Sequence, residues 1–84
     1  MARKDKLLAR LRARPRDYTW AEGCSVMAAH GFSLENRSGS RRMFRHEMSG
    51  AKVILHEPHN RPHLLPYEIA LLIDGLKEVG VIIE

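Results

Sequence analysis

The stretch that decides the fold is residues 32–56, FSLENRSGSRRMFRHEMSGAKVILH. It holds three short segments separated by the turn sequences Ser38-Gly39-Ser40 and Met48-Ser49-Gly50. Apolar and polar residues alternate in the first segment, the second covers 41–46, and the third covers 51–56 and is rich in strand-forming apolar residues. Short turns between consecutive strands predict an antiparallel meander.

One helix is expected before this meander in the sequence and one after it. Thr19 and Glu22 have the spacing of a capping box, which predicts a helix over about 20–29 that ends at Gly31. Pro66 suits a first helical turn, so a second helix is expected from 66 or 67 to 79. The apolar stripe of this last helix is Ile69, Leu72, Ile73 and Leu76.

The N-terminal residues predict one more helix. Leu7, Leu8 and Leu11 form an apolar stripe among basic residues over 4–13, and Pro15 ends it. Residues 1–14 are therefore an extra basic amphipathic helix. Three prolines in 57–66 predict an irregular loop.

The element order predicts an α+β fold, α-α-β-β-β-α, with helices on one face of a three-stranded antiparallel sheet. The other face should be free and basic, because the strand at 41–46 offers few apolar side chains. Eighty-four residues form a single domain, which excludes a two-domain enzyme with a cofactor cleft. The chain shows neither a membrane-spanning run nor a secretory signal, so a soluble cytoplasmic protein is expected.

Charge is distributed unevenly along the chain. Residues 1–14 carry six basic residues against one acid, 37–46 carry four arginines and no acid, and 62–84 are net acidic. Two basic blocks are typical of a polyanion partner such as nucleic acid, although a basic surface kept for solubility would give the same pattern.

Cys24, Trp20 and Tyr67 are interpreted as packing residues. Cys24 and Trp20 lie at helical spacing with Met27, and a lone cysteine makes neither an internal disulfide nor a thiolate cluster. Tyr67 begins the last helix and is expected to pack rather than to act as an acid.

Two groups of residues could carry chemistry. The turn and strand from Ser38 to Arg42 bring glycine and serine N–H groups beside arginines, which suits a phosphate. His56, His59 and His63 follow, with His46 nearby in sequence. Three imidazoles could hold zinc, but the loop does not fix their spacing, so no metal and no cofactor is expected. Acid–base cleavage of RNA needs only a base, an acid and positive charge on the phosphate.

Several of these motifs, in this order, resemble the HicA family of toxins from bacterial toxin–antitoxin pairs over about 15–80. The resemblance rests on Arg16-Asp17-Tyr18-Thr19-Trp20-Ala21-Glu22, His30-Gly31-Phe32, Ser38-Gly39-Ser40-Arg41-Arg42-Met43-Phe44, His56-Glu57-Pro58-His59 and the terminal helix 65–80.

The resemblance implies a fold like a double-stranded-RNA-binding domain. It also implies a ribosome-independent endoribonuclease (an mRNA interferase) that cuts messenger RNA, with a HicB-type antitoxin that covers its active site. One position departs from the family: its catalytic histidine follows the glycine–serine pair, where this chain has Arg41. Arginine keeps its proton in proteins and cannot serve as a general base.

A nearby histidine must therefore supply the base if the chain cleaves RNA. The candidates are His46, His56 and His59, with His56 the first choice and His59 the second. The expected RNA or phosphate contacts are Gly39, Ser40, Arg41, Arg42, Arg45 and Arg61.

Two alternatives remain open. One is a non-catalytic RNA-binding or antitoxin-binding module of the same fold, and the other is a regulator or scaffold that does not touch RNA. The tail Val81-Ile82-Ile83 is either a last strand or an exposed end, and an exposed end could pair edge to edge with a second copy to form a homodimer.

Overall fold

The computed structural model describes residues 3–83, and the side chains of 5–83. The elements are the helices α1 (Arg3–Arg12), α2 (Trp20–Ala29) and α3 (Pro66–Glu78) and the strands β1 (Phe32–Asn36), β2 (Arg41–His46) and β3 (Lys52–His56). The predicted order α-α-β-β-β-α is confirmed, and α2-β1-β2-β3-α3 is arranged as in a double-stranded-RNA-binding domain.

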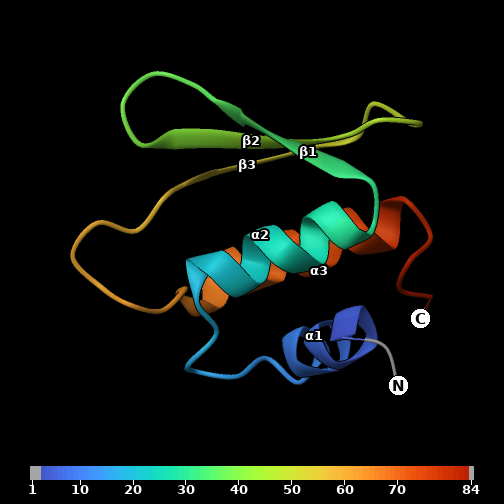
Figure 1. Ribbon diagram of the computed structural model, residues 1–84, viewed down its shortest axis with the longest axis horizontal. Coiled ribbons are helices and arrows are strands. Elements are labelled where there is room, and N and C mark those ends of the chain that lie inside the picture. The colour runs from blue at the N-terminus through green and yellow to red at the C-terminus, as the bar shows by residue number, and fades with distance from the viewer. Residues whose placement is uncertain (1–2, 84) are drawn as a thin grey trace.

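Three layers build the molecule (Figure 1). The antiparallel sheet has the order β1-β2-β3, α2 and α3 cover one of its faces, and α1 packs beneath these two helices. Within residues 3–83, no helix covers the opposite face of the sheet. The core between the layers consists of Leu11, Tyr18, Val26, Met27, Phe32, Phe44, Val53, Leu55, Leu64, Ile69, Leu72, Ile73, Leu76 and Ile82.

The helix ends follow from local sequence. The Thr19 side chain accepts a hydrogen bond from the Glu22 N–H at 3.1 Å, and the Glu22 carboxylate accepts one from the Thr19 N–H at 2.9 Å, so the capping box is confirmed. Helix α1 ends differently: Arg14, just beyond it, has a φ of 54°. Glycine usually occupies this left-handed position, and another residue there costs roughly 1–2 kcal/mol.

Helix α1 belongs to the core rather than standing apart as a basic arm. Leu11 is fully buried, and the buried Tyr18 hydroxyl donates to the Leu7 carbonyl at 2.8 Å. Burial raises the pKa of Tyr18 to about 12. The Arg10 guanidinium lies over the Tyr18 ring and pairs with Asp17 at 2.8 Å. Its charge is therefore already paired within the chain.

Two expectations differ from the structure. Val81-Ile82-Ile83 forms no strand: the Val81 and Ile82 N–H groups donate to the Leu76 carbonyl, and Ile82 is buried, which leaves Ile83 as the exposed residue of this tail. Tyr67 does not pack, because its side chain is 57% exposed. In the part of the chain described here, every helix is too short or too polar to cross a membrane.

Candidate active site

The free face of the sheet is lined by every second residue of β2 and β3. Arg41, Met43 and Arg45 of β2 pair with His56, Ile54 and Lys52 of β3, respectively. Backbone hydrogen bonds join Ser40 to Glu57 and His46 to Ala51. Because hydrogen-bonded and non-hydrogen-bonded pairs alternate, the three pairs on the free face are non-hydrogen-bonded, the position where opposite side chains are closest.

Basic side chains therefore oppose one another directly at both ends of this face. Arg45 faces Lys52, and Arg41 faces His56, with a nearly buried Met43 and a half-exposed Ile54 between them. Arg45 and Lys52 are like charges at directly opposite positions, which destabilises a sheet unless an anion lies between them. Glu35 of β1 partly supplies one, since its carboxylate binds Arg45 at 2.7 Å and Arg37 at 3.2 Å. The Arg41–His56 end has no such carboxylate among the ion pairs of the described side chains.

The turn between β1 and β2 brings a serine to this end. Gly39 has a φ of 61°, which lets the chain reverse between Arg37 and Arg41. The Ser40 hydroxyl then lies 3.1 Å from His56 Nδ1. With Nδ1 engaged, Nε2 is the ring nitrogen that a substrate can reach on the exposed His56 side chain.

Arg42 supports the site from below rather than facing a substrate. Its guanidinium, 18% exposed, donates to the Glu57 carboxylate at 3.1 Å and to the carbonyls of Gly39 and Arg41 at 2.9 and 3.0 Å. These bonds tie the turn to the segment that follows β3 and so keep Ser40 beside His56. The sequence predicts that Arg42 contacts phosphate, but its Nε and Nη1 donors are already bonded within the chain.

Arg61 is also engaged elsewhere. Its guanidinium binds both oxygens of the fully buried Glu68 at 2.6 and 3.1 Å. Burial raises the pKa of Glu68, but the hydrogen bonds from Arg61 and the Leu65 N–H outweigh burial and hold that pKa below its ordinary value. His56 makes the smallest contribution to this lowering.

The remaining histidines do not join His56. His59 is exposed on the loop after β3, and in the described residues no hydrogen bond links it to Ser40 or His56. His63 pairs with Thr19 through the backbone. Within residues 5–83, no three His, Cys, Asp or Glu side chains gather as metal ligands.

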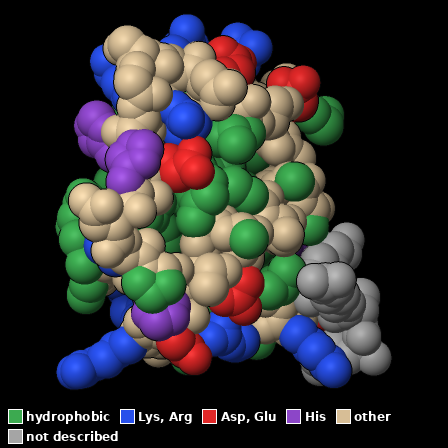
Figure 2. Space-filling model, turned by 60° about the vertical axis from the view of Figure 1, so that its left-hand side comes forward, with side chains coloured by type: hydrophobic (Ala, Val, Ile, Leu, Met, Phe, Trp, Pro, Cys, Tyr) green, Lys and Arg blue, Asp and Glu red, His purple; other side chains and the backbone are tan. Residues whose placement is uncertain are grey.

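The expectations for Cys24 and Trp20 hold in outline. Both are partly buried against the core, and Trp20 lies 5.6 Å from the Phe44 ring. Burial, with a contribution from Glu57, raises the pKa of the Cys24 thiol to about 11, so it is unreactive at neutral pH. Figure 2 shows the end of the molecule that carries the β1–β2 turn, where histidines lie beside Lys and Arg side chains.

Comparison with known proteins adds nothing to this geometry. A scan against models of protein families, a search of curated proteins and a search of solved structures each found no match for this chain.

Proposed function

We propose that this chain is an endoribonuclease of the HicA type, the toxin of a toxin–antitoxin pair, and that His56 does the work of the family's displaced histidine. The observation that carries the proposal is the pairing of Arg41 with His56. The resemblance expects an imidazole where Arg41 stands, and the adjacent strand presents one at the directly opposite position on the same face.

The chemistry assigns a role to each group around this pair. His56 Nε2 removes the proton of a ribose 2′-hydroxyl, while the Ser40 hydroxyl holds the ring through Nδ1. The 2′-oxygen forms a bond to phosphorus and the bond from phosphorus to the 5′-oxygen breaks. The products are a 2′,3′-cyclic phosphate and a 5′-hydroxyl, whose proton comes from water or from the imidazolium.

Arg41 supports this reaction electrostatically. Its guanidinium is exposed beside His56 and can donate two hydrogen bonds to the phosphoryl oxygens as negative charge builds on them. Arg45 and Lys52, further along the same face, bind flanking phosphates. The reaction draws every group from this chain and from water.

The proposal is tested by incubating the purified chain with 5′-labelled single-stranded RNA in EDTA. We expect cleavage into fragments that end in 2′,3′-cyclic phosphate, and growth arrest when the chain is induced in a bacterium without an antitoxin. His56→Ala should slow cleavage by about 10²–10⁴-fold and still bind the RNA. RNA binding without cleavage by the wild-type chain would instead identify a non-catalytic RNA-binding module.

A further inference from the structure

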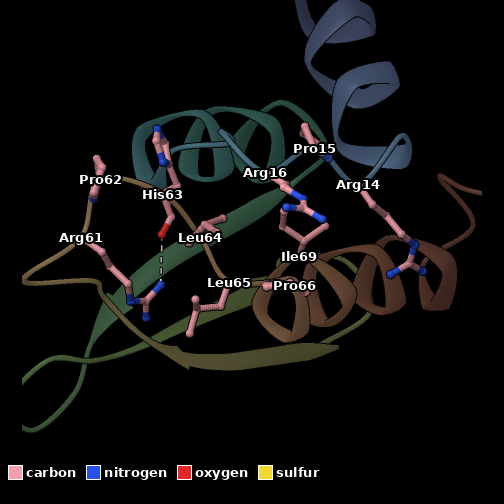
Figure 3. A pocket seen from close by; sticks show the side chains of 10 residues that line it. All are labelled: Arg14, Pro15, Arg16, Arg61, Pro62, His63, Leu64, Leu65, Pro66 and Ile69. Carbon is pink, nitrogen blue, oxygen red and sulfur yellow. Dashed lines mark hydrogen bonds between the residues drawn. The ribbon is translucent and has the colours of Figure 1, made fainter.

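A cavity lies where the loop before α3 meets the linker between α1 and α2. A cavity of about 510 Å³ opens between residues 14–16, which link α1 to α2, and residues 61–66, which lead into α3 (Figure 3). We call it the linker groove. Its volume is in the usual range of ligand pockets, and it shares no residue with the Ser40–His56 pair.

The two walls of the linker groove are joined beside it. The Leu64 N–H donates to the Tyr18 carbonyl at 2.8 Å, and Thr19 forms a β-bridge with His63. Pro15, Pro62 and Pro66 fix the backbone around the opening. A preformed groove binds a ligand without the cost of ordering its own walls.

The interior of the groove is aliphatic and its rim is cationic. Leu64 and Ile69 form the floor, and Leu65, 41% exposed, stands at the edge. Arg14 and Arg16 extend from the linker toward α3 (Figure 3). Within the described residues, neither arginine forms an ion pair.

The acidic residues near the groove cannot neutralise these two arginines. Asp17 is bound by Arg10 at 2.8 Å, and Glu68 is bound by Arg61 at 2.6 Å. The rim therefore presents net positive charge beside exposed apolar surface. Arg14 also has a left-handed backbone conformation, in which glycine would be more stable. Strained residues of this kind are often found at functional sites, which favours a binding role for the Arg14 charge.

We infer that the linker groove binds an acidic segment of a partner protein, which places aliphatic side chains on Leu65 and carboxylates on Arg14 and Arg16. Among the described residues, the lining holds no Phe, Tyr or Trp side chain, which favours an aliphatic peptide over a nucleotide, since bases bind single-stranded sites chiefly by stacking on such rings. This inference is independent of the proposed ribonuclease activity.

The test is a selection of random twelve-residue peptides displayed on phage against the immobilised full chain. We expect the enriched peptides to combine Asp or Glu with Leu, Ile or Val. A synthetic peptide of the leading sequence should then bind the chain at micromolar concentration, and binding should weaken by about tenfold in the double variant Arg14→Gly with Arg16→Gln, because two rim charges are lost.

The chain offers well-matched controls. Arg14→Gly should leave the melting temperature unchanged or raise it, because glycine suits the left-handed position, so weaker binding by the double variant cannot be attributed to unfolding. Lys52→Gln removes one positive charge from the sheet face and should leave peptide binding unaffected. Failure to enrich any peptide, or enriched peptides that bind the double variant as well as the wild-type chain, would overturn the inference. So would a loss of RNA affinity in the double variant, which would assign the groove to RNA.

Discussion

Two serine–histidine pairs stand at opposite ends of the sheet, and they differ in how far the histidine ring is exposed. At one end, Ser40 Oγ lies 3.1 Å from His56 Nδ1, and at the other, Ser49 Oγ lies 2.9 Å from His46 Nδ1. The same two side chains serve different purposes because of what surrounds them.

The His46 pair is part of the fold. Its ring packs edge-on against Phe32 at 5.0 Å, its Nδ1 accepts the Ser49 N–H at 3.2 Å, and its Nε2 lies against Gly31. Ser49 in turn accepts the Ala51 N–H, so this pair closes the turn between β2 and β3. The His56 pair closes no turn; its ring is exposed and faces Arg41. Hydrogen bonding between serine and histidine is therefore no sign of catalysis unless a ring nitrogen and a nearby cation remain accessible.

The largest effect expected from a change near the His56 pair is on cleavage by Arg41→Ala. Loss of the guanidinium removes the donor that stabilises the phosphorane, and the rate should fall by about 10²–10³-fold, as when one oxyanion donor is deleted. Arg41→Lys should recover part of this loss, because it keeps the charge without the paired donors. The measurement is the single-turnover rate on labelled RNA, and unchanged rates in Arg41→Ala would mean that the cation beside His56 has no part in the chemistry.

A second substitution tests how much the Glu68–Arg61 ion pair stabilises the fold, separately from any effect on cleavage. Glu68→Gln should lower the free energy of unfolding by about 2 kcal/mol at neutral pH, because it weakens two charge-assisted hydrogen bonds in a buried site. The folded-state pKa of Glu68 is lowered, so its stabilisation is complete above the ordinary value of 4.5 and is lost as the pH falls through the folded-state pKa.

Urea unfolding at a series of pH values measures this difference. The gap between the wild-type chain and Glu68→Gln should be constant near neutrality and close as the solution becomes acidic. A gap that widens on acidification would contradict the assignment of an ionised, paired Glu68.

The two serines give a matched pair of smaller effects. Ser49→Ala should cost about 1 kcal/mol of stability, because a turn hydrogen bond is lost, and leave cleavage unchanged. Ser40→Ala should do the reverse: it should leave the melting temperature nearly unchanged and reduce the cleavage rate severalfold, since His56 loses the bond that orients its ring. Equal effects of both variants on cleavage would remove the distinction between the two pairs.

The smallest expected effect is that of a single phosphate contact. Lys52→Gln should weaken RNA binding and make the slope of log affinity against log salt shallower by about 1, whatever the RNA sequence. Lys6→Gln removes the same charge from exposed α1, in the layer farthest from the sheet, and should leave the slope unchanged. Identical slopes for both variants would argue against a phosphate path along the free face.

Much of the fold is predictable from local signals. The capping box at Thr19, the two short turns and Pro66 set bounds of five elements closely, because each acts within a few residues. The short turns also fix the register, so the meeting of His56 with the second strand could be predicted. The need for glycine at position 75 could not be predicted in this way. It arises because Val53 of β3 would clash with a side chain there.

The parts of the site that escaped prediction depend on long-range contacts. Arg42 and Arg61 look like phosphate ligands by charge alone, but their partners Glu57 and Glu68 are brought to them only when the 57–65 loop folds. The linker groove likewise requires residues 14–16 and 61–66 to meet, although they are far apart in sequence. Arg14 beside the groove has a left-handed backbone conformation, and the sequence pattern does not predict it.

The most direct test of the account compares the two histidines under one set of conditions. Single-turnover cleavage of labelled RNA in EDTA is measured for His56→Ala and His46→Ala, at a temperature where circular dichroism shows both variants folded. We expect His56→Ala to be slower than the wild-type chain by at least about 10²-fold, and His46→Ala to cleave within about threefold of it. Loss of cleavage in His46→Ala with activity retained in His56→Ala would contradict the account.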